Sequence, residues 1–165
     1  MTRWVTRIQR MGCTLDVAAF NYIIELFSKL ALMREVESWM QRMSSGDVVP
    51  DVHTYTSIIE CCAKCKDAGR GVEWFERMRD AGVAPELQTY ANIIDACAKS
   101  KMPQEADRWY HRMIKSNFHS NQAIYNSMID ASIKCEDPYG AEKWFMTMRK
   151  NGIFGNAVTF NSLIT

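Results

Sequence analysis

The sequence predicts an all-α solenoid built from two-helix repeats of 35 residues. All five tryptophans share this spacing, at Trp4, Trp39, Trp74, Trp109 and Trp144. An aromatic residue recurs at the same interval, at Phe20, Tyr55, Tyr90, Tyr125 and Phe160. An isoleucine does so as well, at Ile24, Ile59, Ile94, Ile129 and Ile164. A scattered core would not place every tryptophan at one interval, whereas stacked structural repeats produce such a pattern.

The first half of each repeat has the apolar spacing of one helix face, with apolar or small residues at i, i+3, i+4 and i+7. The four copies are Phe20, Ile23, Ile24, Phe27; Tyr55, Ile58, Ile59, Cys62; Tyr90, Ile93, Ile94, Cys97; and Tyr125, Met128, Ile129, Ser132. We therefore expect an amphipathic helix in the first half of every repeat.

The second half of each repeat has the same spacing around its tryptophan. The copies are Val36, Trp39, Met40, Met43; Gly71, Trp74, Phe75, Met78; Ala106, Trp109, Tyr110, Met113; and Ala141, Trp144, Phe145, Met148. Tryptophan and methionine at helical spacing indicate a packed core and require no cofactor to explain them. These residues predict a second helix that buries its tryptophan.

Turn residues agree with this period. Asp137-Pro138 offers a carboxylate cap followed by proline at the first helical position, and Pro103 lies 35 residues before Pro138. Pro50 and Pro85 favour an extended residue before the next repeat begins. We expect the second helices to end at residues that tolerate the left-handed conformation, namely Gly12, Asp47, Gly82, Asn117 and Gly152.

The period divides the chain into four full repeats and two partial ones. Full repeats are expected at residues 17–51, 52–86, 87–121 and 122–156. Residues 1–16 correspond to the second half of a repeat, and residues 157–165 to the start of another. Neither end has the polar outer face of a capping repeat, so we expect a longer parent array.

Composition excludes several classes of protein. The net charge of +1 gives no overall attraction to nucleic acid, so any basic surface must come from the arrangement of side chains. No apolar run approaches the roughly 20 residues of a membrane span, so no membrane partner is expected. The first ten residues contain no apolar signal core and therefore no recognisable targeting segment.

The copies resemble the pentatricopeptide repeat family. Characteristic segments are Val52-His-Thr-Tyr-Thr-Ser-Ile-Ile and Leu87-Gln-Thr-Tyr-Ala-Asn-Ile-Ile, and two repeats end in Pro50-Asp51 and Pro85-Glu86. The tetratricopeptide unit has 34 residues and a Trp-x-x-Leu-Gly-x-x-Tyr signature, which is missing here. The last two full copies depart from the Pro-Asp ending, with Asn121 and Asn156 at their ends.

The resemblance implies a right-handed superhelix that binds single-stranded RNA at about one base per repeat, mostly in mitochondria or chloroplasts. Such proteins act in RNA processing, stabilisation, editing or translation. We expect no cofactor, no metal and no small-molecule substrate. The sequence has no Ser/His/Asp order, no phosphate-binding glycine loop and no carboxylate cluster in a plausible pocket, so we expect no catalysis by this segment itself. A nuclease or deaminase domain beyond Thr165 would make the parent protein an enzyme.

By this resemblance, two side chains per repeat read a base: the residue after the first-helix aromatic and the last residue of the repeat. The pairs are Asn21 with Asp51, Thr56 with Glu86, Ala91 with Asn121, and Asn126 with Asn156, and the unpaired members are Asp16 and Asn161. An asparagine amide both donates and accepts hydrogen bonds, whereas a carboxylate only accepts. The first pair is expected to favour U and the fourth a pyrimidine, C more than U. Thr56 points to a purine, and Ala91 carries no hydrogen-bonding group.

Two further series are assigned by the same resemblance. Base-sandwiching residues are expected at Ala18, His53, Gln88, Ala123 and Val158, of which only Val158 is the usual valine. Lysines that could approach phosphates end the first helices, at Lys29, Lys64, Lys99 and Lys134. A cation at a helix C-terminus is also favourable by a few tenths of a kcal/mol, so the lysine series has a purely structural alternative.

The cysteines have two interpretations. Cys62-Ala-Lys-Cys65 has the spacing of half a zinc site, but no second pair follows. Cys62 aligns with Cys97, and Cys65 with Cys135, so we expect these four to be small buried residues of the repeat. His53, His111 and His119 are expected to face solvent.

A second functional hypothesis remains open: a protein–protein interaction scaffold that holds a peptide in the same groove. Near-neutral charge, Ala91 and Glu86 favour it, whereas the lysine series and the two pairs that begin with an asparagine, at Asn21 and Asn126, favour RNA. RNA binding should weaken steeply with salt, and peptide binding much less.

Overall fold

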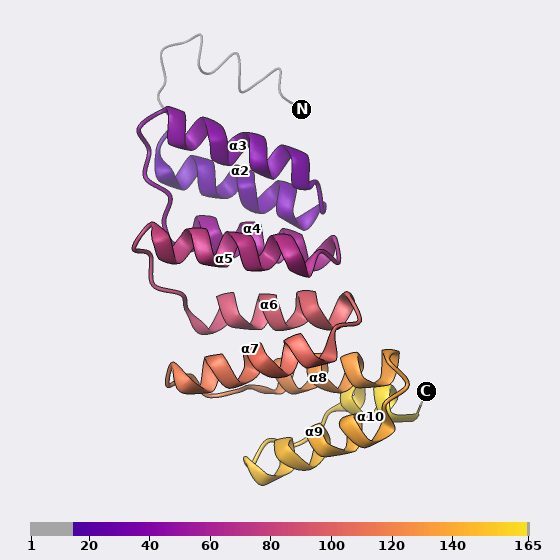
Figure 1. The fold of residues 1–165 in the computed structure, drawn as a ribbon. Helices are drawn as coiled ribbons and strands as arrows, with labels where there is room; N and C mark the ends of the chain where they lie inside the picture. Colours follow the sequence, from indigo (N-terminus) through magenta and orange to yellow (C-terminus); the bar gives the residue numbers. More distant parts are fainter. Residues whose placement is uncertain (1–14, 165) are drawn as a thin grey trace.

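The structure, a computed structural model, describes residues 15–164 as a stack of helical hairpins (Figure 1). Nine helices lie in this part of the chain and no strand does, which confirms the all-α repeat fold. Residues 1–14 and 165 lie outside the described part of the chain. The predictions for Trp4, for Gly12 and for most of the first partial repeat fall on them. No described helix is long and apolar enough to cross a membrane.

The helices recur at the predicted interval. First helices are α2 (Val17–Lys29), α4 (Val52–Lys64), α6 (Leu87–Lys99), α8 (Gln122–Lys134) and α10 (Ala157–Ile164). Second helices are α3 (Met33–Ser45), α5 (Ala68–Asp80), α7 (Pro103–Lys115) and α9 (Pro138–Lys150). Both series therefore begin every 35 residues.

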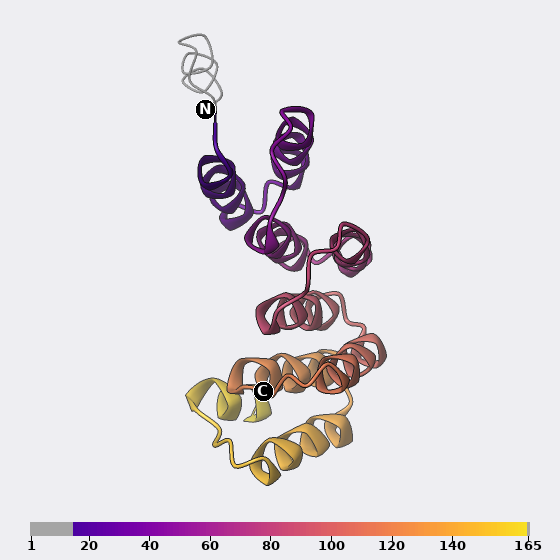
Figure 2. The ribbon, with the colours of Figure 1, turned by 90° about the vertical axis from the view of Figure 1, so that its left-hand side faces the viewer.

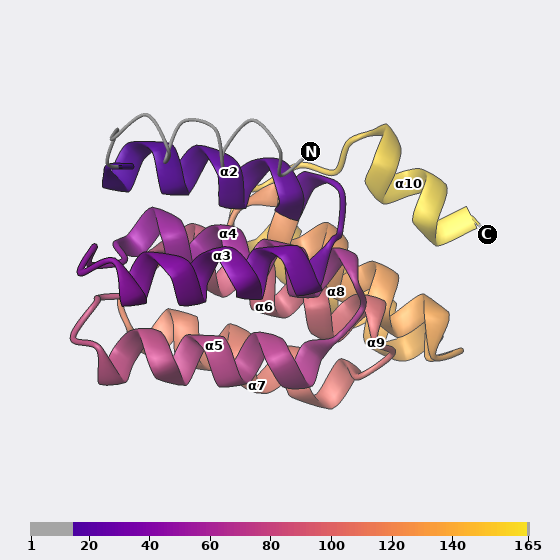
Figure 3. The ribbon, with the colours of Figure 1, turned by 90° about the horizontal axis from the view of Figure 1, so that it is seen from above.

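The helices form two layers, which Figure 2 shows from the side. The first helices pack against one another in chain order and form a continuous layer. Each of α3, α5 and α7 packs against its own first helix and against the next one. Seen from above, the helix direction differs clearly between α2 and α10, so successive repeats are turned about the axis of the stack (Figure 3).

The core lies between the layers and confirms both predicted stripes. Every described tryptophan is at most 7% exposed, and every predicted stripe residue is buried except Phe145, which is half-buried. Aromatic rings connect one hairpin to the next: Phe75 lies 5.2 Å from Tyr90 and 4.8 Å from Trp109, measured between ring centroids. Such edge-to-face pairs contribute about 0.5–1.5 kcal/mol beyond the area that they bury.

The second helices end as predicted. Asp47, Gly82, Asn117 and Gly152 follow them with φ of 55°, 75°, 63° and 72°. At the other end, Pro138 is the first residue of α9, and Asp137 accepts a hydrogen bond of 2.9 Å from the Gly140 N–H. Pro103 likewise begins α7.

The first helices end in the left-handed region too, which the sequence analysis missed. Ala31, Lys66, Lys101 and Glu136 have φ of 55–58°, although none is a glycine or asparagine. The next repeat binds the carbonyl oxygen of three of them. The Cys65 thiol donates to Ala31 (3.3 Å), the Ser100 hydroxyl to Lys66 (2.8 Å) and the Cys135 thiol to Lys101 (3.6 Å).

This arrangement corrects the prediction for two cysteines. Cys62 and Cys97 are buried as expected, but Cys65 is exposed and Cys135 is half-buried. Both follow the last residue of a first helix, so their side chains lie at the turn and not in the core. No cluster of His, Cys, Asp or Glu that could hold a metal ion occurs among the described residues. The three histidines are exposed, as predicted.

Replacing Trp74 with Ala should lower the free energy of unfolding by about 3–5 kcal/mol, because it removes a buried ring from the junction of α4 and α5. Chemical denaturation would measure the change. Tyr139→Ala is the matched control, since that ring is 82% exposed and its loss should cost little. Equal effects of the two substitutions would contradict the burial of the second-helix stripe.

In the folded protein, Cys65 should react with iodoacetamide well before Cys62 and Cys97. Burial raises the pKa of Cys62 to about 12 and that of Cys97 to about 11, so neither forms thiolate at mildly alkaline pH. Mass spectrometry of the alkylated peptides would give the order, and unfolding in guanidinium should abolish the difference. Early modification of Cys62 would show that the first-helix core is open.

Candidate nucleic-acid interface

The predicted base-reading residues lie along one edge of the first-helix layer. One member of each pair lies in the first turns of a first helix, and the other is the residue before the next first helix. Because the first helices pack side by side, an early residue of α2 comes close to the start of α4. Asn21 and Asp51 are therefore neighbours in space, although 30 residues separate them in sequence.

Asn21 and Asp51 are in direct contact. The Asn21 Nδ2 atom donates to both carboxylate oxygens of Asp51, each at 3.0 Å. The Thr54 hydroxyl donates to the Asn21 Oδ1 atom at 2.5 Å. Asn21 is only 8% exposed, so this network holds it between α2 and α4.

Asp51 also caps helix α4. Its Oδ1 atom accepts the Thr54 N–H at 2.9 Å, and its own N–H donates to the Thr54 hydroxyl at 3.1 Å. This reciprocal arrangement is a capping box. Burial acts to raise the pKa of Asp51, but hydrogen bonds from Thr54 and Asn21 outweigh it and keep the pKa below its usual value. The carboxylate is therefore ionised at neutral pH.

At the second and third pairs, the hydrogen bonds run to the third residue of the next first helix, which is Thr89 or Ile124. The Thr56 hydroxyl lies 2.9 Å from the Thr89 hydroxyl, while Glu86 is exposed and its N–H donates to Thr89 at 3.3 Å. At the next junction, Ala91 has no polar side-chain atom. Asn121 there accepts the Ile124 N–H at 3.1 Å and caps α8.

Thr159 bridges the two members of the fourth pair. Thr159 donates to the Asn126 Oδ1 atom at 2.6 Å, and its N–H donates to the Asn156 Oδ1 atom at 3.1 Å. The Asn156 Nδ2 atom donates to Gln122 at 3.0 Å.

Asp16 and Asn161, the base-reading positions that belong to none of the four predicted pairs, lie at the ends of the described array. Asp16 caps α2 and accepts the Ala19 N–H at 2.8 Å. Asn161 lies on α10 and is exposed.

The predicted base-sandwiching residues are exposed in the first turn of each first helix, at Ala18, His53, Gln88, Ala123 and Val158. Each lies three residues before a base-reading position and therefore on a neighbouring part of the helix surface. Two of them have partners: His53 Nε2 lies 3.4 Å from a Glu25 oxygen, and the Gln88 amide donates to Asn92 at 2.8 Å.

The four lysines are ion-paired, which the sequence analysis missed. Each lies beside an acidic residue one helical turn earlier: Lys29 with Glu25 (2.6 Å), Lys64 with Glu60 (2.7 Å), Lys99 with Asp95 (2.6 Å), and Lys134 with Asp130. The hydrogen bond to Glu25 raises the pKa of Lys29, and the same bond lowers the pKa of Glu25. The four lysines and their four acidic partners therefore carry no net charge together. It also lies eight residues, about 12 Å, along the helix from the base-reading row.

A separate basic series lies on the second helices. Arg42, Arg77 and Arg112 stack over Trp39, Trp74 and Trp109, with 4.8, 4.6 and 4.6 Å between the guanidinium carbon and the ring centroid. Arg112 also donates to Glu76 of the preceding repeat at 2.9 Å. Their spacing of 35 residues was visible in the sequence, but arginine on an exposed helix face gave no reason to select it.

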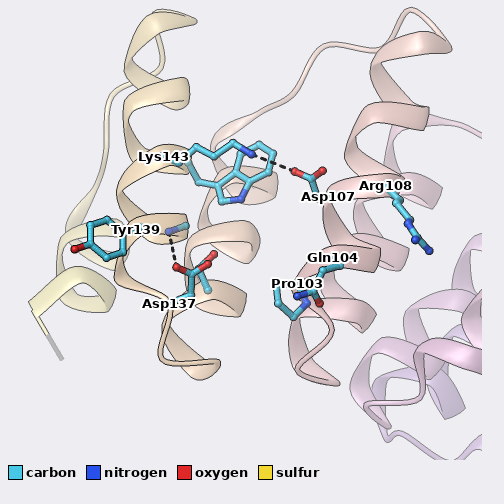
Figure 4. A pocket seen from close by; sticks show the side chains of 10 residues that line it. Pro103, Gln104, Asp107, Arg108, Asp137, Tyr139 and Lys143 are labelled. Atoms are coloured by element: carbon cyan, nitrogen blue, oxygen red, sulfur yellow. Dashed lines mark hydrogen bonds and ion pairs between the residues drawn. The ribbon is translucent and has the colours of Figure 1, made fainter.

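Two open cavities lie between successive second helices. One of ≈ 500 Å³ separates α7 from α9, where Lys143 reaches Asp107 at 3.6 Å (Figure 4). The other, of ≈ 560 Å³, lies between α3 and α5 and includes Tyr55 and Trp74 in its wall. None of the predicted base-reading, base-sandwiching or lysine residues lines either cavity.

The fold is shared with solved structures of low sequence identity. The pentatricopeptide repeat protein PPR10 from maize matches with a TM-score of 0.82 and 17% identity, over 97% of this chain and 23% of that one. PPR10 in complex with an 18-nt psaJ RNA element gives a TM-score of 0.87 with 17% identity, over 97% of this chain and 24% of that one. This chain thus spans about a quarter of the length of PPR10.

A shorter structure matches over most of its length. It is the repeat domain of Arabidopsis thaliana protein-only RNase P 1 in complex with tRNA. The TM-score is 0.79 with 15% identity, over 98% of this chain and 86% of that one. Among curated proteins, none matches the sequence.

Family models match most of the sequence. The pentatricopeptide repeat domain matches residues 38–100, the PPR repeat residues 88–118, and the PPR repeat family residues 120–165. Together with the 35-residue helical period and the shared fold, these matches assign the chain to the pentatricopeptide repeat family.

Proposed function

We propose that this chain binds single-stranded RNA along the base-reading edge of its first helices, at about one base per repeat. The proposal rests on the Asn21–Asp51 contact and on the Asn126–Asn156 pair linked through Thr159, because they put polar side chains at the same place on the first and fourth repeats. Two structures with this fold contain RNA, namely PPR10 with its psaJ element and the RNase P repeat domain with tRNA. Repeats that each read one base are an established way to recognise RNA.

The four pairs differ in how strongly they can select a base. Asn21 is held by two partners and is proposed to select U, whereas Asn126 is held by Thr159 and is proposed to select a pyrimidine, C more than U. Thr56 favours a purine. Ala91 offers no hydrogen bond, so the base at that repeat is weakly specified.

Phosphate binding by the lysines requires an exchange of partners. Lys29, Lys64, Lys99 and Lys134 each have an acidic neighbour, so a phosphate oxygen must compete with a carboxylate for the ammonium group. The exposed residues Ala18, His53, Gln88, Ala123 and Val158 are proposed to flank the bases. Small or polar side chains at four of these positions should make the stacking weak compared with the 1–3 kcal/mol of an aromatic platform.

The biological role is proposed from the family. The parent protein would act in a mitochondrion or chloroplast, in the processing, stabilisation, editing or translation of a transcript. The array would supply binding and leave any catalysis to another domain or another protein.

Affinity for a pool of short single-stranded RNAs should exceed that for the matching DNA pool and should fall with salt. The slope of log K against log salt should be roughly −0.7 for each phosphate contact. Fluorescence titration at several salt concentrations would measure it. Replacing Glu25 and Glu60 with Gln, and Asp95 and Asp130 with Asn, should raise affinity by freeing the lysines.

The matched control replaces all four lysines with Gln, which should flatten the salt dependence. Equal affinity for the RNA pool and the matching DNA pool at low salt would contradict the proposed RNA selectivity. Tight binding of a peptide with little salt dependence would favour the scaffold instead.

Replacing Asn126 with Ser or Thr should move the preferred base at that repeat from pyrimidine toward purine, because the amide is exchanged for a hydroxyl. Sequencing of RNA bound from a random pool would report the preference. Thr147→Ser is the control, since Thr147 lies on α9, bonds the Lys143 backbone of the same helix and belongs to none of the proposed RNA-contacting series. An unchanged preference in the Asn126 variants would refute the proposed register.

A further inference from the structure

Three threonines touch the proposed base-reading side chains from the neighbouring repeat. They are the third residues of α4, α6 and α10, namely Thr54, Thr89 and Thr159, and each is completely buried. Their hydroxyl oxygens lie 2.5 Å from Asn21, 2.9 Å from Thr56 and 2.6 Å from Asn126.

The fourth junction is different in a correlated way. Helix α8 has Ile124 at the equivalent position, and the residue on the preceding first helix is Ala91. A hydroxyl is therefore present at the three junctions where the base-reading side chain is polar. It is replaced by an apolar group at the one junction where that side chain is apolar. This matching is expected if the hydroxyl acts on the base-reading side chain.

The hydrogen bonds determine how the hydroxyl acts at the two asparagines. The Oγ1 atoms of Thr54 and Thr159 each accept the backbone N–H of the capping residue, at 3.1 Å. The single hydroxyl hydrogen is then available for one acceptor. The asparagine Oδ1 atom is nearer than the oxygen of the capping side chain, at 2.5 against 3.0 Å for Thr54 and 2.6 against 3.2 Å for Thr159.

This bond orients the amide. Because an asparagine oxygen only accepts and its nitrogen only donates, a donor at Oδ1 turns Nδ2 away from the threonine. At Asn21 the nitrogen reaches Asp51, and one of its two hydrogens is enough for that carboxylate. A single N–H hydrogen directed between the two carboxylate oxygens accounts for both 3.0 Å distances, and the second hydrogen is then left for a ligand.

We propose that Thr54, Thr89 and Thr159 are positioning residues for base recognition, an inference that rests on the RNA-binding function proposed above. At Asn21 and Asn126 the threonine occupies the amide oxygen, so the repeat presents an N–H donor and selects a base with an acceptor on its edge. At the second repeat, the Thr89 hydroxyl is hydrogen-bonded to the Thr56 hydroxyl, and either group can be the donor. Thr56 can therefore present a donor or an acceptor to the base, so we expect weaker selection there.

The test compares Thr54→Val, which removes the hydroxyl at similar size, with Thr54→Ser, which keeps it. The probes are four single-stranded RNAs that differ only in the base facing Asn21, with the sequence otherwise taken from the pool that the wild-type chain enriches. In the valine variant, the ratio between the affinities for the best and the worst base should fall about fivefold, because the loss of one net hydrogen bond changes an affinity by about that factor. The serine variant should retain the ratio.

The junction at Ala91 allows the reverse test. Ala91→Asn alone places an amide beside Ile124, whereas Ala91→Asn with Ile124→Thr adds the positioning hydroxyl. The double variant should discriminate among the bases at that repeat about fivefold better than the single variant. Thermal unfolding of each variant would show that all remain folded.

The outcomes separate the two proposals. If Thr54→Val weakens all four RNAs equally and leaves the ratio unchanged, the threonine only caps α4, and the positioning role is refuted while RNA binding stands. If the wild-type chain binds no RNA at low salt, the proposed function is overturned and the positioning role falls with it.

Discussion

No hairpin of this array can bury its apolar side chains alone, and the rest of the structure follows from that constraint. Phe75 of α5 packs against Tyr90 and Trp109 of the next hairpin. The Tyr110 ring in turn packs against Tyr125 and Trp144 of the following hairpin, with ring centroids 5.9 and 4.8 Å apart. Each repeat must therefore offer the same surface to its neighbour. Equal packing at every junction is what aligns equivalent polar residues along one edge of the first-helix layer.

Features governed by local rules could be predicted from the sequence. The tryptophan interval, the apolar stripes and the left-handed residues Gly82 and Gly152 each depend on a few neighbouring residues and their conformational preferences. The fold class follows from their repetition. The position of the base-reading pairs came from family resemblance, since nothing local indicates that Asn21 and Asp51 are neighbours.

Contacts between repeats could not be predicted, because they depend on the angle and distance at which hairpins pack. The bond from Thr54 to Asn21 spans 33 residues, and that from Cys65 to Ala31 spans 34. The recurrence of cysteine at Cys65 and Cys135 predicted a core position, yet Cys65 lies in an exposed turn and bonds the preceding repeat. The lysine pairs were within reach of the sequence, since Glu25 and Lys29 are one turn apart.

Helix capping restricts which side chains can stand at the boundary between two repeats. Asp51, Asn121 and Asn156 each accept a backbone N–H at the start of the next first helix, and only short polar side chains do this well. A substitution there to alter contacts with a ligand also alters the stability of the following helix. Redesigning this array for a new ligand is therefore constrained to a small set of residues at the boundary.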